Sequence, residues 1–195
     1  MDDDTDDYSD AAEIPTPEEW IDDFPIGELT PEEHAAVKDV INGEKMQRFK
    51  THENRYVVVG AGEASDAWER RMVVYDRLNN RPKAAAITLE ELGLGDDEIR
   101  LWAAVFQLLC DLASQVVAVI EDFDGGYTWE LALLFAADYR DFAWILKRTY
   151  EDEQTERERY DNSMGISHVR LLLTGDHAHE WRDIEDLKEC VSHIP

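Results

Sequence analysis

The sequence predicts an α/β fold in which a parallel, doubly wound sheet of about five strands carries helices on both faces. Two observations predict this class. The first is a set of short, unbroken runs of branched apolar residues, such as residues 56–60 and 116–120, and the second is their alternation with longer segments of helical periodicity. Strands buried on both faces read as continuous apolar runs, and their alternation with helices is typical of parallel βαβ units.

Three parts of the chain differ in composition. The first is acidic and contains several prolines, so we expect a flexible arm there. The second holds a helix and a linker, and the third is the Rossmann-like α/β domain. The three parts are residues 1–28, 29–54 and 55–195.

A capping box predicts the helix of the second part. Thr30 is the N-cap, Pro31 occupies the first helical position, and Glu33 stands where a side chain can reach back to the cap. We expect this helix to end at Ile41 and residues 44–54 to form the linker.

Apolar runs and helical periodicity then define the elements of the α/β domain. The pattern predicts strands at residues 56–60, 84–88, 116–120 and 142–146. Helices are expected at residues 67–79, 96–114, 129–139, 151–160 and 183–193. Residues 169–173 are compatible with a strand or with a helix.

The charge balance favours a halophilic protein. The chain has 45 acidic and 19 basic residues, a net charge of -26. Molar salt shortens the Debye length to about 3 Å and screens such self-repulsion. An acidic protein from an ordinary cell is the alternative. The sequence has no basic stripe to neutralise phosphates, which argues against nucleic acid as a partner.

Other features indicate a cytoplasmic protein. Cys110 and Cys190 fall in predicted helices without a C-x-x-C pairing, so we expect two core residues in a reducing compartment. The N-terminus lacks the apolar region of a signal peptide, and no apolar stretch reaches about 18 residues, so we expect no membrane association.

The segment after the 116–120 strand holds the sharpest candidates for function. Asp124, Gly125 and Gly126 form a tight turn, and Glu130 lies in the first turn of the helix that follows. Ligands of open α/β sheets bind outside the carboxyl ends of the strands, where Asp124 and Glu130 are expected. Glu130 has two interpretations: it complements the helix dipole, or it acts on a sugar as a nucleophile or ligand.

Gly60 and Gly62 follow the first strand and let backbone or ligand approach closely. A tight strand-to-helix turn without a ligand explains them equally well, because Ser65 replaces the third glycine of a dinucleotide fingerprint. His177 and His179 are metal-binding residue types two positions apart. Without further ligands at fixed spacing we interpret them as a surface loop, and we expect no metal.

These residues resemble those of the nucleoside 2-deoxyribosyltransferases. The similar features are the Gly60-Ala61-Gly62 turn, the spacing of Asp124 from Glu130, the Glu130-Leu131 pair and Asn162-Ser163-Met164. The resemblance spans roughly residues 56–193 and, with the acidic arm, extends to uncharacterised halophilic archaeal members of that superfamily. The Gly125-Gly126-Tyr127-Thr128 run also resembles, with one glycine missing, the Pro-Gly-Gly-x-Gly-Thr turn of phosphoribohydrolases.

The resemblance implies a flavodoxin-like fold and roles for several residues. Glu130 would attack the anomeric carbon, and Asp124 would hold the sugar. Asn162 and Met164 would be supplied across a subunit interface, which implies a homodimer at least. No cofactor is implied.

We therefore expect a nucleoside- or nucleotide-binding protein that cleaves or transfers an N-glycosidic bond. The alternative is a non-catalytic nucleotide sensor or protein-interaction module on the same fold. Two departures from the family favour the alternative: Ala132 replaces a glycine, and residues 107–109 lack the carboxylate that would handle the base proton.

Overall fold

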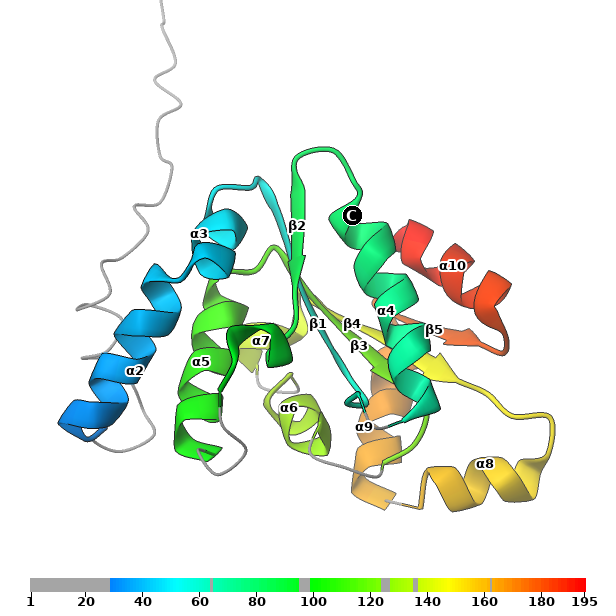
Figure 1. Ribbon diagram of the computed structural model, residues 1–195. Coiled ribbons are helices and arrows are strands. Elements are labelled where there is room, and N and C mark those ends of the chain that lie inside the picture. The colour runs from blue at the N-terminus through cyan, green and yellow to red at the C-terminus, as the bar shows by residue number, and fades with distance from the viewer. Residues whose placement is uncertain (1–28, 64, 95–98, 124–126, 135–136, 162) are drawn as a thin grey trace, which may run out of the picture.

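The computed structural model describes residues 29–195 except 64, 95–98, 124–126, 135–136 and 162. Its centre is a five-stranded sheet with the strand order β2-β1-β3-β4-β5, in which every neighbouring pair is parallel. The strands are β1 (Asn54–Gly60), β2 (Ala84–Ile87), β3 (Gln115–Ile120), β4 (Ala143–Arg148) and β5 (Ala178–Trp181). This is the doubly wound, flavodoxin-like topology that the sequence predicts (Figure 1).

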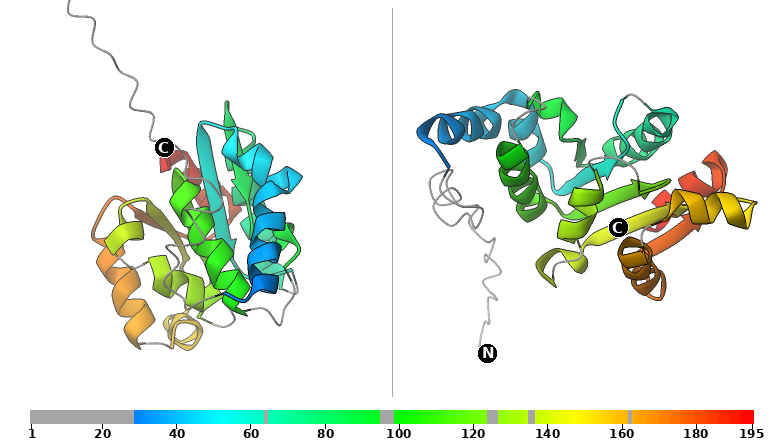
Figure 2. Two further views of the ribbon diagram at one scale, coloured as in Figure 1. Left: turned by 90° about the vertical axis from the view of Figure 1, so that its left-hand side faces the viewer. Right: turned by 90° about the horizontal axis from the view of Figure 1, so that it is seen from below.

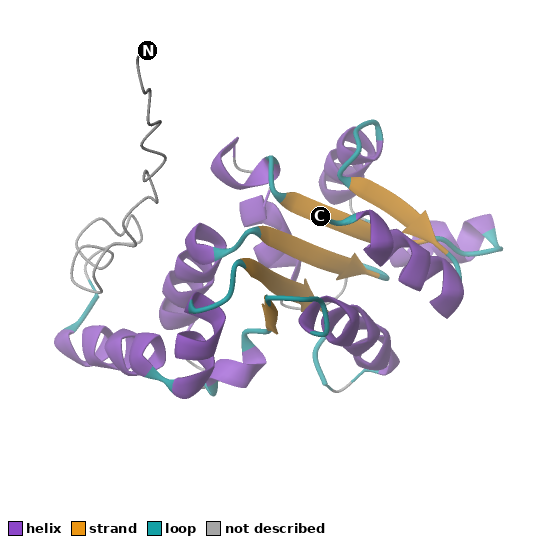
Figure 3. Ribbon diagram, turned by 90° about the horizontal axis from the view of Figure 1, so that it is seen from above, coloured by secondary structure: helices purple, strands orange, loops and turns teal. Residues whose placement is uncertain are grey.

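Helices cover both faces of the sheet (Figure 3). One face packs against α4 (Asp66–Asn79) and α10 (Ile184–His193), and the other packs against α5 (Ile99–Leu112), α6 (Tyr127–Leu134) and α9 (Ser163–Leu173). The strands alternate accordingly: Val58 and Val117 face the first layer, whereas Val57 and Val116 face the second. Both sides of each central strand are therefore buried, which is why these strands read as unbroken apolar runs.

The N-terminal helix forms as its capping box predicts. α2 (Pro31–Asn42) begins after Thr30, whose side chain accepts a hydrogen bond from the backbone of Glu33, while the Glu33 carboxylate accepts one from the Thr30 backbone. Val37 and Ile41 are its buried residues. The helix packs on α5, outside the layer that touches the sheet.

The expectation of a linker at residues 44–54 is wrong. These residues contain α3 (Glu44–Lys50), which packs on β2. Met46 and Phe49 are the buried residues of α3, three positions apart and thus on one helical face. Gly43 is extended between α2 and α3, so a seven-residue helix with its own apolar face replaces the linker.

The C-terminal third also corrects the sequence interpretation. Residues 169–173 belong to helix α9, and the segment interpreted as a surface loop at His177 and His179 leads into the fifth strand, β5. Both imidazoles stack on Trp144 of β4, at centroid distances of 4.9 and 5.8 Å. This strand of four residues has the polar His179 and Glu180 between buried Ala178 and Trp181, so it lacks the apolar run that marks the other strands.

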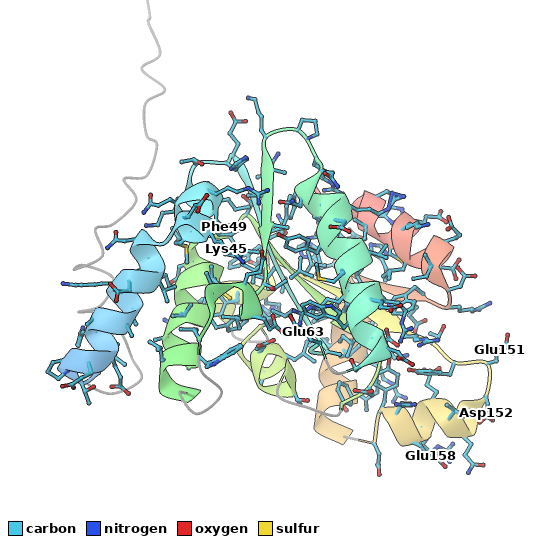
Figure 4. All side chains as sticks on the ribbon, viewed as in Figure 1. Lys45, Phe49, Glu63, Glu151, Asp152 and Glu158 are labelled. Carbon is cyan, nitrogen blue, oxygen red and sulfur yellow. The ribbon has the colours of Figure 1, made fainter. Side chains whose placement is uncertain are left out.

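The remaining elements are close to expectation. The predicted 129–139 helix consists of α6 and the short α7 (Ala137–Arg140), and the charged 151–160 segment contains α8 (Glu153–Arg159). Exposed carboxylates surround α8, as the side chains labelled Glu151, Asp152 and Glu158 show (Figure 4). Both cysteines are buried and unpaired, as expected. No helix among the described residues has the length and apolarity needed to cross a membrane.

Gly60 is the glycine that the fold requires most. Its φ angle is +152°, and a Cβ atom there would lie 2.7 Å from the Val119 carbonyl oxygen and 3.0 Å from Cδ of Arg71. We predict that Gly60→Ala lowers the free energy of unfolding by about 1–3 kcal/mol. Urea denaturation in molar KCl measures it. Gly62→Ala is the control, because a Cβ atom at Gly62 meets nothing within 4 Å; equal losses in the two variants would refute the assignment.

Candidate functional site

The winding of the sheet reverses between β1 and β3. The chain leaves β1 toward α4 on one face and leaves β3 toward α6 on the other, so it departs from these two adjacent strands toward opposite faces of the sheet. Gly60, the last residue of β1, pairs in register with Val119 of β3. A crevice outside the carboxyl ends at such a reversal is the usual ligand site of this fold class. The right-hand view of Figure 2 looks onto the molecule from below, the side on which α6 and α8 lie in Figure 1.

Glu130 lies beside this reversal. It is in the first turn of α6, a helix that contacts β1. The Thr128 hydroxyl donates a 3.2 Å hydrogen bond to the Phe123 carbonyl and so ties the start of α6 to the segment after β3. Leu131 and Leu134 face the core, whereas Glu130 is half-buried. The carboxylate therefore stands at the edge of the buried face of α6, as the sequence suggests.

The environment of Glu130 favours its neutral form. Burial is the largest cause, the negative charge of Glu90 adds to it, and the positive charge of Arg71 opposes both. The net effect raises the pKa of Glu130 from 4.5 to about 7. Simple complementation of a helix dipole would lower the pKa instead, so the dipole alone does not describe this residue.

A buried arginine organises the same edge. Arg71 of α4 is only 2% exposed; it donates to the Gly60 carbonyl oxygen at 2.8 Å and to Oε2 of Glu90 at 2.6 Å. Its guanidinium carbon lies 4.5 Å from the centre of the Trp68 ring. Glu90 belongs to η1 (Glu90–Leu92), the 3₁₀ helix that follows β2. Arg71 thus joins α4, the end of β1 and the segment after β2.

Two orphan polar atoms accompany this arrangement. Nε of Arg71 and the hydroxyl of Thr88, which directly follows β2, are buried without a hydrogen-bond partner among the described residues. Buried polar groups are nearly always paired, by ordered water where protein atoms do not serve. The carboxyl ends of β1 and β2 therefore carry two hydrogen-bond donors that are not paired with any described protein atom.

The structure describes only some of the candidate site residues that the sequence predicts. The structure brings the helix that carries Glu130 against β1, which ends at Gly60, and Gly62 lies in the loop that follows. Asp124, Gly125, Gly126 and Asn162 lie outside the described residues, and Met164 lies in α9, where its side chain is not described. Glu63, in the loop after β1, lies above α6 in Figure 4.

Sequence reasoning missed Arg71 and Glu90. Arg71 lies in the middle of a helix rich in charged residues, and Glu90 in a short acidic segment, so neither stands out by type or spacing. One signal was available: an arginine at a position of α4 that shares a helical face with apolar Val74, Tyr75 and Leu78.

A separate hollow of 680 Å³ lies beyond the ends of β4 and β5, against α10. The His179 and His193 rings are 4.7 Å apart there, and burial, with the positive charge of His193, lowers the pKa of His179. Glu130, Glu90 and Arg71 are not among its lining residues. Across the described part of the chain, no three His, Cys, Asp or Glu side chains are arranged to hold a metal ion.

Comparison with known proteins gives the chain a family. Residues 18–194 match a family of unknown function (DUF8170), and the chain belongs to that family. No curated protein matches it, and no solved structure does.

The interaction of Glu130 with Glu90 is testable by titration. Glu90→Gln removes the negative neighbour and releases Arg71, and both changes favour the Glu130 carboxylate. We predict that the pKa of Glu130 falls below the value of about 7, although not fully to 4.5, because burial remains. NMR titration of the side-chain carboxyl carbon measures this. Glu44→Gln, at an exposed position of α3, should leave the pKa unchanged; an unchanged or higher pKa in Glu90→Gln would contradict the account.

Proposed function

We propose that this member of a family of unknown function binds a nucleoside or nucleotide at the carboxyl edge of its sheet and cleaves or transfers its N-glycosidic bond. One observation carries the proposal: Glu130 is half-buried at the winding reversal, with a pKa of about 7. Strongly shifted carboxyl groups beside a crevice are typical of catalytic sites.

In the proposed reaction the ionised Glu130 attacks the anomeric carbon. A carbon–oxygen bond forms to the carboxylate, the carbon–nitrogen bond breaks, and its electron pair goes to the leaving base. The base nitrogen takes up a proton from water. Water or a second base then attacks the anomeric carbon of the glycosyl ester and loses a proton to the hydroxide left by the first step, which releases the Glu130 carboxylate and gives the hydrolysis or the transfer product.

Glu90 and Arg71 act on this step through charge. Arg71 keeps part of the Glu130 population ionised against burial, and Glu90 fixes the Arg71 guanidinium at 2.6 Å. Asp124 is proposed to orient the sugar. Asn162 of a second copy of the chain is proposed to contact Glu130, so the working form would be a homodimer.

The acidic composition supports a working environment of molar salt. The net charge of -26 is spread over a chain that still builds two buried layers on its sheet. Screening at a Debye length of about 3 Å removes most of the repulsion between exposed carboxylates. Assays of function therefore belong in molar KCl.

Base release from a panel of nucleosides, nucleotides and NAD tests the proposal. We predict release by the wild-type protein, at a rate that rises with pH until Glu130 is ionised, above about 7. Glu130→Ala should slow release by roughly three orders of magnitude or more. Glu158→Ala, at an exposed position of α8, should retain the wild-type rate.

The contrary result also has a defined meaning. Absence of release by the wild-type protein, with binding of a panel member intact, would replace the enzyme by a non-catalytic nucleotide sensor. Release that survives in Glu130→Ala would remove Glu130 from the reaction.

A further inference from the structure

Two arginines converge on one buried carboxylate at the carboxyl end of β3. Glu121, which follows β3, is 5% exposed. Its Oε1 accepts a hydrogen bond from Nε of Arg70 at 2.5 Å, and its Oε2 accepts from Nη2 of Arg70 and Nη1 of Arg148, both at 2.6 Å. Arg70 belongs to α4 and Arg148 ends β4, so the cluster joins three elements at the edge that carries Glu130.

Two aromatic rings lie against the Arg148 guanidinium. Its central carbon lies 5.0 Å from the centre of the Tyr150 ring and 5.4 Å from that of Trp181. The Tyr150 hydroxyl donates a 2.7 Å hydrogen bond to the Glu121 carbonyl oxygen. The cation is therefore held in place before any ligand arrives, which reduces the entropy lost on binding.

The cluster carries more positive charge and more donors than Glu121 uses. Two guanidinium groups hydrogen-bond one carboxylate, the negative charge of Asp66 also acts on Arg70, and three hydrogen bonds occupy only part of the guanidinium N–H groups. Nε of Arg148 is buried without a hydrogen-bond partner among the described residues. The Arg70 and Arg148 side chains keep 23% and 28% exposure, so both remain accessible from solvent.

A purely structural ion pair would need only one of these arginines. The Glu121 contact to Arg70 is already bidentate, which satisfies both carboxylate oxygens. The second arginine adds a positive charge and further N–H donors at one spot of a chain whose total charge is -26. Such a spot attracts an anion that the rest of the surface repels.

We propose that Arg70 and Arg148 bind the phosphate group of the ligand, with Glu121 as the positioning residue that orients both guanidinium groups. The substrate class is then a nucleoside phosphate rather than a free nucleoside. This inference rests on the proposed function for the sugar and base, but the phosphate contact stands on the arginine cluster alone. Arg71, the next residue of α4, faces the Glu90 and Glu130 side of the same edge.

Calorimetric titration tests the proposal with three probes in molar KCl: inorganic phosphate, adenosine 5′-monophosphate and adenosine. We expect the monophosphate to bind more tightly than adenosine. Arg70→Gln and Arg148→Gln should each weaken binding of phosphate and of the monophosphate by at least about tenfold and leave adenosine unchanged. Arg77→Gln is the matched control, two turns further along α4 and exposed.

Removal of an arginine leaves Glu121 less compensated, so a measurement on the wild-type protein accompanies the variants. Addition of phosphate should shift the side-chain Nε–Hε signals of Arg70 and Arg148 in ¹⁵N NMR spectra but not that of Arg77. Absence of these shifts, or variants that bind the monophosphate like wild type, would overturn the phosphate site.

The two proposals fail separately. Base release from nucleosides without arginine-dependent phosphate binding would overturn the phosphate site and leave the glycosidic reaction standing. Arginine-dependent binding of phosphate without any base release would support the phosphate site and end the enzymatic proposal.

Discussion

The carboxyl edge of this sheet depends on one buried cation. Arg71 reaches from α4 to the last carbonyl of β1 and to Glu90 beyond β2, and it is 2% exposed while doing so. A charge so deeply buried is stable only if its partners stay in place. Arg71 therefore fixes the relative positions of α4, β1 and η1. Together with the Val119 carbonyl oxygen, its stem also occupies the space that a side chain at Gly60 would need.

Consecutive residues of α4 belong to two charged clusters. Arg71 hydrogen-bonds Glu90 and opposes the rise in the pKa of Glu130. Arg70 hydrogen-bonds Glu121 at the end of β3. Since α4 is a rigid helix packed on β1 and β2, the two clusters keep a fixed separation. A ligand that touched both would span the winding reversal, with its reacting carbon near Glu130 and its anionic group near Arg70.

Much of the fold could be predicted because the spacing of apolar residues along the chain reflects which side chains are buried. The continuous apolar runs predict four strands, the capping box predicts α2, and the sequence predicts Glu130 in the first turn of the helix after β3, where α6 has it. The elements that were missed are short: α3 has seven residues, of which Met46 and Phe49 are buried, and β5 has four, of which only the first and the last are buried. The apolar face of α4 marks Arg71 as a buried arginine, but its pairing with Glu90 was not predictable, since Glu90 follows β2 and reaches Arg71 only when β1 and β2 pair.

The proposed reaction requires that Glu130 forms a covalent bond to the anomeric carbon. Intact and peptide mass spectrometry of the protein, after rapid acid quenching with a substrate that releases its base, detects such a bond. We expect a sugar adduct on the peptide that contains Glu130, and no adduct in Glu130→Gln. Rapid base release with no adduct at any quench time would show that water, and not Glu130, attacks the sugar.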